Sequence, residues 1–353
     1  MRKYLFILLL AGVQSTLFSQ QLVENKAEAV GMSSERLNTL SHTFHQYVNQ
    51  GQLPGTVTLI ARKGQVVYHE AIGMQDIENE IAMGTDAMFR IASQTKAIVS
   101  TAVMMLQERG LLLISDPISK YIPEFKNSTV AVKNEDDSYD VLPANREITI
   151  RDLLTHTAGI GYGYGVAAEK WEEADLQGWY FAHRDEAVLE TIKRIAVLPH
   201  DAQPGTQFVY GYNTDILGAL VNVVSGQSLA EFLSEHILDP LGMNDTYFYL
   251  PKNKAKRLAT VYNMVDQKLV RAPKEGTMQS QGHYVKGPRK NYSGGAGLVS
   301  TAMDYAKFLQ MMLNGGTYNN HRILSRKSVE LMTVDHLGGI EYSWQNGMGF
   351  GLG

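Results

Sequence analysis

Hydrophobic and polar positions along the chain follow two different periods, and each period predicts a different kind of element. Apolar residues recur over 56–61 and 65–71 in short β-rich runs, and Lys63-Gly64 between them predicts a hairpin turn. Over 97–109 the apolar positions recur three and four residues apart, which predicts a helix with a buried face. Strand-like sequence lies mainly in the first third and helical sequence in the middle. This distribution predicts an α+β fold with a large helical region inserted.

Capping residues and turn signals give the other expected elements. A first helix is expected from Ser33 or Ser34, and Ser228 with Glu231 forms a capping-box pattern. The glycine- and tyrosine-rich segment 159–165 either lines a cleft or is a flexible surface loop. The polar segment 126–147 is expected to be an exposed excursion. Further helices are expected over 148–154, 213–224, 228–238, 302–313 and 325–332, and a hairpin over 264–270.

The N-terminus has the pattern of a targeting segment. Met1-Arg2-Lys3 is positively charged, residues 4–13 are apolar, and small and polar residues follow before residue 21. We therefore expect residues 1–20 to be a signal peptide and the protein to be exported, in a bacterial periplasm or secreted. The apolar run is too short to cross a bilayer, and with no second long apolar run we expect no stable membrane span after cleavage.

Composition excludes several classes of function. The 353 residues are 44% hydrophobic and 19% charged, which is an ordinary globular balance. The formal charge of −4 gives no basic surface for nucleic acid. The absence of cysteine excludes disulfides, cysteine nucleophiles and thiolate metal sites. The two histidines of the first helix, His42 and His45, have no third ligand in sequence and are expected at the surface.

Ser93 and Lys96 are the candidate catalytic pair. Ser93 stands where the extended segment 89–91 changes into the long apolar helix, in the N-cap or first-turn position that serine favours. Lys96 lies three residues later, so its amine can reach the serine hydroxyl on the same helix face. This is the S-x-x-K arrangement of acyl-transfer enzymes. The alternative is a plain helix cap, although a cation in the first turn opposes the helix dipole.

Six runs together resemble the penicillin-recognising serine enzymes of class C β-lactamase type, a family that includes D-amino-acid peptidases and short-chain esterases. The resemblance implies Ser93 as the nucleophile, with its backbone N–H in the oxyanion hole, Lys96 as base or proton relay, and Tyr210 of the family's Y-x-N motif as base or relay. It implies a mainly antiparallel sheet flanked by helices, beside an all-helical region, and calls for no cofactor. The runs are 91–96, 113–125, 148–160, 204–226, 239–246 and 294–313.

The sequence departs from that family in two motifs. Tyr212 replaces the Asn of Y-x-N and Asn213 follows it, so both are candidate substrate-binding residues and the departure favours ester substrates over β-lactams. His336-Leu337-Gly338 matches the third motif, H-x-G, by letter but comes too early and is not assigned. We expect that motif and the C-terminal strands beyond Gly353. The expected layout is a sheet part over 21–90 and 291–353 and a helical part over 91–290, truncated at its C-terminus.

These residues predict an exported serine hydrolase that forms an acyl-enzyme with a small-molecule or peptide substrate. Either Lys96 accepts the serine proton as a neutral amine, or it stays charged and stabilises a Tyr210 phenolate that accepts it. The substrate is a short-chain ester, a β-lactam or a D-amino-acid peptide. One alternative is a catalytically weak penicillin-recognising sensor of the same fold, and another is a structural exported domain. The sequence does not define an oligomeric state.

Overall fold

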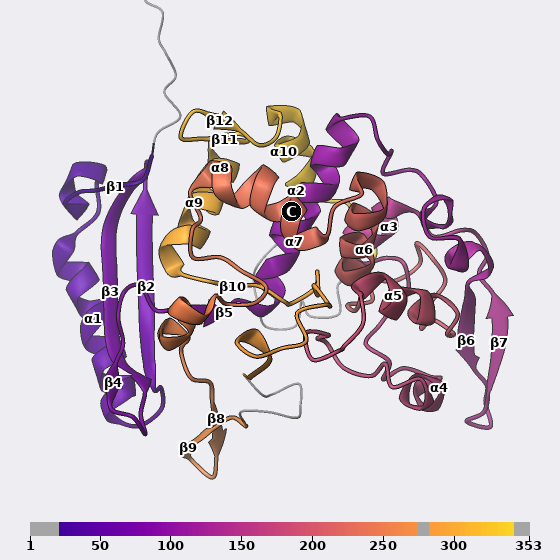
Figure 1. Ribbon diagram of the computed structural model, residues 1–353, viewed down its shortest axis with the longest axis horizontal. Coiled ribbons are helices and arrows are strands. Elements are labelled where there is room, and N and C mark those ends of the chain that lie inside the picture. Colours follow the sequence, from indigo (N-terminus) through magenta and orange to yellow (C-terminus); the bar gives the residue numbers. More distant parts are fainter. Residues whose placement is uncertain (1–20, 274–281, 342–353) are drawn as a thin grey trace, which may run out of the picture.

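The computed structural model describes residues 21–273 and 282–341 (Figure 1). The signal peptide predicted for residues 1–20 therefore lies outside the described residues. A sheet with helices on both faces forms one side of the protein, and a larger group of helices forms the other. In this part of the chain no single helix has the length and apolarity of a membrane span; only the bent pair Asn213–Ser225 and Leu229–Leu241 reaches them when taken together.

The main sheet has the strand order β1-β3-β2, and β4 pairs with β3. Strands β2 and β3 are antiparallel and joined by Lys63 and Gly64, whose φ angles of 52° and 72° are those of a two-residue type I′ hairpin turn. The predicted hairpin is confirmed. The described strands are β1 (Val23–Glu24), β2 (Gly55–Arg62), β3 (Gln65–Asp76), β4 (Ile81–Ala82), β5 (Phe89–Arg90), β6 (Thr129–Lys133), β7 (Tyr139–Pro143), β8 (Tyr262–Val265), β9 (Lys268–Arg271), β10 (Val299–Ser300), β11 (Thr317–Tyr318) and β12 (His321–Arg322).

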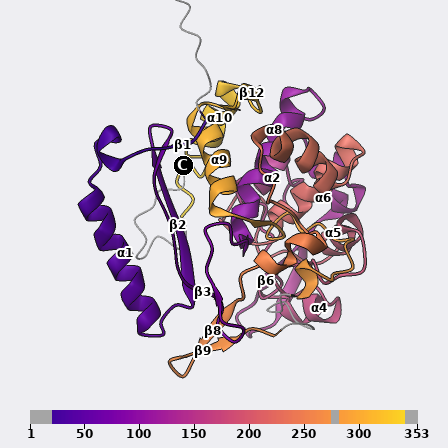
Figure 2. The ribbon, with the colours of Figure 1, turned by 60° about the vertical axis from the view of Figure 1, so that its left-hand side comes forward.

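Helices cover both faces of this sheet. Helix α1 packs against β3 and α9 packs against β2, and Figure 2 shows these two helices on opposite sides of the strands. Ser33 caps α1 by accepting a hydrogen bond from the Arg36 N–H, as its sequence position predicts. The described α-helices are α1 (Ser34–Asn49), α2 (Thr95–Glu108), α3 (Ile150–Leu154), α4 (Ala168–Glu173), α5 (Val188–Ala196), α6 (Asn213–Ser225), α7 (Leu229–Leu233), α8 (Asp239–Leu241), α9 (Ala302–Leu313) and α10 (Arg326–Met332).

Helix α2 is the central element of the hydrophobic core. It packs against α6 and α7, and Ile98, Val99, Ala102 and Leu106 on it are fully buried. Burying an aliphatic side chain of this size contributes about 1.5–3 kcal/mol relative to leaving it exposed. The apolar pattern predicted this helix, and its burial gives the residues at its N-terminus a rigid support.

The polar segment 126–147 is ordered as well as largely exposed. Residues 126–147 form a hairpin in which β6 pairs with β7, and Val130 and Ala131 are buried. Val130 also forms a parallel bridge with His200. Most of the other residues of this segment are exposed, so the expected exposed excursion is present, and it takes the form of a β-hairpin. The hairpin formed by β8 and β9 over 262–271 is present, and so are the capping boxes at Thr149 and Ser228.

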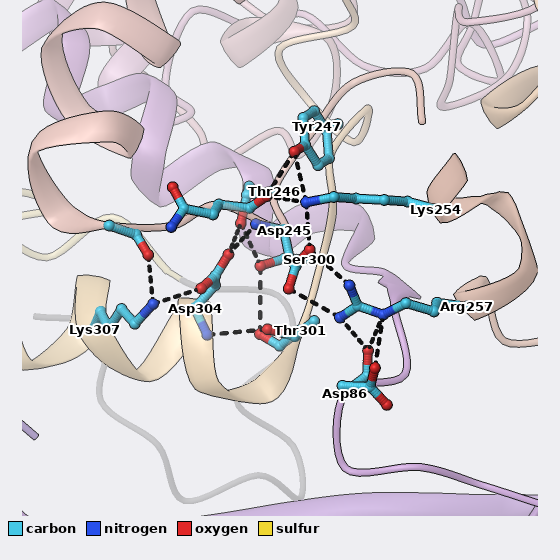
Figure 3. Close-up of polar contacts among 12 residues, drawn as sticks. Asp86, Asp245, Thr246, Tyr247, Lys254, Arg257, Ser300, Thr301, Asp304 and Lys307 are labelled. Carbon is cyan, nitrogen blue, oxygen red and sulfur yellow. Dashed lines mark hydrogen bonds and ion pairs between the residues drawn. The ribbon is translucent and has the colours of Figure 1, made fainter. Parts of the chain in front are cut away.

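A polar network fixes strand β10 (Figure 3). Asp245 accepts hydrogen bonds from both terminal nitrogens of Arg257, at 2.8 and 2.9 Å. The buried Asp304 carboxylate accepts from the Asp245 backbone N–H at 2.7 Å and from the Thr246 hydroxyl at 3.2 Å. Thr246 in turn contacts the hydroxyl of Ser300 in β10 at 2.7 Å. The network therefore holds β10 in place beside β5, the strand that leads to Ser93.

Candidate active site

Ser93 lies in a tight turn between β5 and α2. Strand β5 pairs with β10, and the Ile91 N–H extends this pairing to the Leu298 carbonyl at 3.0 Å. The chain then turns at Ala92, whose φ of 43° is unusual for a residue other than glycine and is typical of strained functional sites. Ser93 follows in the 3₁₀ turn η2 (Ala92–Gln94), with its side chain exposed.

Ser93 lies at the strand-to-helix junction that the sequence predicts, in the turn directly before α2, but it is not the N-cap residue of the helix. Helix α2 begins at Thr95, and its N-cap residue Gln94 makes no side-chain capping hydrogen bond. The Thr95 hydroxyl instead accepts a hydrogen bond from the Leu298 N–H at 3.1 Å, which ties the start of α2 to the segment before β10. The Ser93 hydroxyl is therefore directed to another partner, the side chain of Lys96.

Lys96 lies at the centre of the candidate site. Its Nζ is 3.2 Å from Ser93 Oγ, 3.3 Å from the Tyr162 hydroxyl and 2.8 Å from the Gly295 carbonyl oxygen. The same nitrogen lies 4.6 Å from the ring centroid of Tyr210. The structure thus brings together Ser93, Lys96 and Tyr210, the three residues selected from the sequence.

Tyr162 and the Gly295 carbonyl are contacts that the sequence did not single out. Tyr162 belongs to the glycine-rich loop 159–165, and its contact with Lys96 brings this loop to the candidate site. Its side chain is hydrogen-bonded to that of Tyr210. Burial, the nearby Asp215 charge and Tyr210 together raise the pKa of Tyr162 well above its ordinary value. Its hydroxyl therefore remains protonated and can donate a hydrogen bond. The alternation of glycine and tyrosine over 159–165 was the only sequence pattern that pointed to Tyr162.

A hydrogen bond from the loop backbone to Asp201 fixes the loop that carries Tyr162. The carboxyl of Asp201 accepts a hydrogen bond from the Gly161 N–H, and burial raises its pKa to about 6. A Cβ atom at Gly161 or Gly165 would lie about 2 Å from the Asp201 carboxylate oxygens, at 2.1 and 2.0 Å respectively. Glycine is needed at both positions because the backbone and the carboxylate are in direct contact.

Tyr212 and Asn213 lie behind the cleft and do not line it. Tyr212 is fully buried, stacks on Phe181 at a centroid distance of 4.6 Å, and donates its hydroxyl to the Leu176 carbonyl at 2.8 Å. The buried Asn213 side chain donates to the Ile160 carbonyl at 3.2 Å and to His156 Nδ1 at 2.9 Å. Both residues therefore support the cleft wall from behind. The sequence had predicted that they contact the substrate.

His156 also supports the wall. Its ring stacks on that of Tyr210 at 4.7 Å, and burial, with the nearby Lys96 charge, lowers its pKa to about 3, so the imidazole is neutral at pH 7. His336 follows α10 and contacts Arg151 and the Leu331 carbonyl. It does not belong to a described strand, so it is not assigned to the third motif.

A cavity of about 430 Å³ opens beside Lys96 and Tyr210. Its walls come from α2, α3 and the segment after α10, and its lining is more apolar than polar, including Leu154, Phe208 and Met332. A larger cleft of about 860 Å³ lies between β2 and α9 and reaches Gln94, next to the candidate nucleophile. Among the described residues, no three His, Asp or Glu side chains converge on a possible metal position.

A serine hydroxyl bonded to a lysine amine at a helix start, beside an apolar cavity, defines the class of serine acyl-transfer sites. Comparison with known proteins gives the family. The Beta-lactamase family model matches residues 40–353, and the chain belongs to this family.

Individual relatives agree with this assignment. The chain is 34% identical over 304 residues to Protein Rv1367c of Mycobacterium tuberculosis, covering 84% of this chain and 71% of that protein. It is 32% identical over 286 residues to Esterase EstB of Burkholderia gladioli, covering 77% and 68%. The solved structure of EstCE1, a hydrolase with promiscuous acyltransferase activity, matches with a TM-score of 0.70 at 25% identity, covering 84% of this chain and 76% of that one.

Proposed function

We propose that this Beta-lactamase-family protein is a serine hydrolase that cleaves carboxylic esters through an acyl-enzyme on Ser93. The observation that carries the proposal is the 3.2 Å contact between Ser93 Oγ and Lys96 Nζ. A serine hydroxyl is a weak nucleophile unless a neighbouring base accepts its proton. Within the described part of the chain, Lys96 is the side chain that forms a hydrogen bond with Ser93 Oγ.

Three oxygen atoms surround the Lys96 nitrogen, and they come from three separate parts of the chain. Lys96 Nζ donates to the Gly295 carbonyl, the Tyr162 hydroxyl and Ser93 Oγ, so it lies where it can exchange a proton with Ser93 during the reaction. Tyr162 is hydrogen-bonded in turn to Tyr210. This chain of groups holds the Lys96 amine in place, and the serine proton stays on Lys96 until the leaving group takes it.

The reaction then proceeds in two steps. Ser93 Oγ attacks the ester carbonyl carbon while its proton moves to Lys96, and the Ser93 backbone N–H stabilises the developing oxyanion. Collapse of the tetrahedral intermediate breaks the bond to the leaving alkoxide, which takes the proton back as an alcohol. In the second step water attacks the acyl-enzyme carbonyl carbon and gives one proton to Lys96. The bond to Ser93 Oγ then breaks, Ser93 takes the proton back from Lys96, and the carboxylic acid is released.

Ester substrates are preferred over β-lactams in this proposal because of Tyr212. It occupies the position where the family's second motif usually has Asn, and its hydroxyl is already bonded to the buried Leu176 carbonyl. It therefore offers no amide group to a lactam substrate. The similarity to a protein named Esterase EstB supports the same choice.

The test measures hydrolysis of p-nitrophenyl butyrate and of a chromogenic cephalosporin by the wild type, Ser93→Ala and the control Ser138→Ala, whose site lies in the distant β6–β7 turn. We expect Ser93→Ala to lose at least about 10³-fold in kcat on the ester, because it removes the nucleophile. Ser138→Ala should match the wild type. A fluorophosphonate probe should label the wild type and not Ser93→Ala. Unchanged ester hydrolysis in Ser93→Ala would overturn the proposal, and faster cephalosporin cleavage would overturn the substrate preference.

We also propose that the enzyme is exported, on the basis of the charged and apolar pattern of residues 1–20. Expression of the full chain in a Gram-negative host, followed by fractionation and N-terminal sequencing, tests this proposal. A periplasmic protein that begins near residue 20 is the expected result. A cytoplasmic protein that retains Met1 would contradict it.

A further inference from the structure

Asp215 is a buried carboxyl that takes no direct part in the proposed mechanism. It lies in the first turn of α6, and its side chain is shielded from solvent. One carboxylate oxygen accepts hydrogen bonds from the Ser293 hydroxyl at 2.7 Å and from the Gly295 N–H at 3.0 Å. Burying a carboxyl group is costly, and burial raises the pKa of Asp215. A costly group at this position calls for a specific role.

The turn that Asp215 contacts is packed directly against the start of α6. A Cβ atom at Gly295 would lie 2.3 Å from the second carboxylate oxygen of Asp215, and one at Gly294 would lie 2.5 Å from the Thr214 carbonyl oxygen. Both glycines are therefore required for this close approach. The turn has little freedom to move while the carboxylate holds it.

Gly295 connects this turn to the candidate nucleophile. Its N–H donates to Asp215, and its carbonyl oxygen accepts the 2.8 Å hydrogen bond from Lys96 Nζ. This is the shortest of the three hydrogen-bond contacts of Lys96, whose Nζ faces Ser93 Oγ at 3.2 Å. A single residue, Gly295, thus joins the buried carboxyl to the proposed base.

We propose that Asp215 is a positioning residue for Lys96, which acts by holding the Gly295 carbonyl at the point where it orients the lysine amine. The inference rests on the proposed function, since it assigns Asp215 a part in the same acyl-transfer site. Without the carboxylate, the Gly295 N–H and the Ser293 hydroxyl lose their acceptor, and the turn moves to find another. A displacement of about 1 Å in a catalytic group can lower the rate by about 10²-fold.

The experiment compares Asp215→Ala and Asp215→Asn with Leu220→Ala, a control at a fully buried apolar position on the same helix. Steady-state hydrolysis of p-nitrophenyl butyrate is measured well below each unfolding midpoint, so that all variants are folded. We expect Asp215→Ala to lower kcat by about 100-fold with KM within threefold of the wild type. Asp215→Asn keeps an acceptor oxygen and should recover kcat to within about tenfold. Leu220→Ala should lose stability but keep its kcat.

Two results would overturn the inference. In the first, Asp215→Ala keeps the kcat of Leu220→Ala, which would make Asp215 a structural residue only. In the second, Asp215→Asn is as slow as Asp215→Ala, which would mean that the accepting oxygen is not what matters. Ser93→Ala, measured in parallel, separates this inference from the proposed function. If Ser93→Ala is active, the proposed function fails. If Ser93→Ala is inactive and either result above is found, the inference about Asp215 fails alone.

Discussion

Replacing Tyr162 by Phe tests whether Lys96 and Tyr210 act through one hydrogen-bonded chain. The substitution removes the hydroxyl that lies 3.3 Å from Lys96 Nζ and that also bonds to Tyr210. The rings around it keep their packing, including the edge-to-face contact with Tyr212 at 5.0 Å. Any change in kcat therefore reports the hydroxyl and not a cavity.

The expected magnitude follows from the bonds that are lost. A hydrogen bond to a group that is charged during the reaction contributes about 1.5–3 kcal/mol, which corresponds to about 10- to 150-fold in rate. Tyr162→Phe should lower kcat within this range. Tyr210→Phe should do so as well, and the double variant should be no slower than the slower single variant, because each substitution interrupts the same chain.

The assay is kcat for p-nitrophenyl butyrate, with Tyr212→Phe as the matched control. Tyr212→Phe leaves the buried Leu176 carbonyl without its donor, so it should cost about 1–3 kcal/mol of unfolding free energy and leave kcat unchanged. If Tyr162→Phe keeps kcat within twofold while Tyr210→Phe is strongly impaired, Tyr210 acts on Ser93 without Tyr162. Fully multiplicative effects of the two substitutions would also refute a single chain.

Two further predictions concern stability. Burial raises the pKa of Asp201 from 3.8 to about 6, so the folded state binds this proton more tightly than the unfolded state and loses stability as the pH rises from about 4 to 6. Relative to Asp201→Asn, the wild type should lose up to about 3 kcal/mol of unfolding free energy over this range. If urea denaturation gives the same difference between the two proteins at pH 4 and at pH 7, the assignment is contradicted. Arg257→Met removes two hydrogen bonds to Asp245 and two to the Asp86 carbonyl, so it should destabilise the protein by about 1–2 kcal/mol in urea at pH 7. A loss below about 0.3 kcal/mol would show that the network is not stabilising.

Local patterns predicted most of the elements because their causes are local. The Lys63-Gly64 turn, the Ser33 cap and the period of α2 each depend on a few neighbouring residues. The Ser93–Lys96 contact was predictable for the same reason, since three residues of helical turn separate them. What the sequence could not give was the contribution of distant segments. Tyr162 is 66 positions from Lys96, and no periodicity links the two.

Local reasoning also failed where tertiary contacts changed the role of a residue. Ser93 has the residue type of a cap, but the pairing of β5 with β10 and the turn at Ala92 place it one residue too early to cap α2. Tyr212 was expected from the sequence to contact substrate, yet its ring stacks on Phe181 and is buried in the core. Both outcomes depend on packing between elements that lie far apart in sequence.

The bond between Lys96 and Gly295 has a consequence for protein synthesis, because its two residues are 199 positions apart. At about 5–20 residues per second, a ribosome reaches Gly295 about 10–40 s after Lys96. During that interval the nascent chain contains Ser93 and Lys96 without the carbonyl that orients the amine and without the β10 partner of β5. Ser93 can therefore gain a fully oriented Lys96 partner only late in translation.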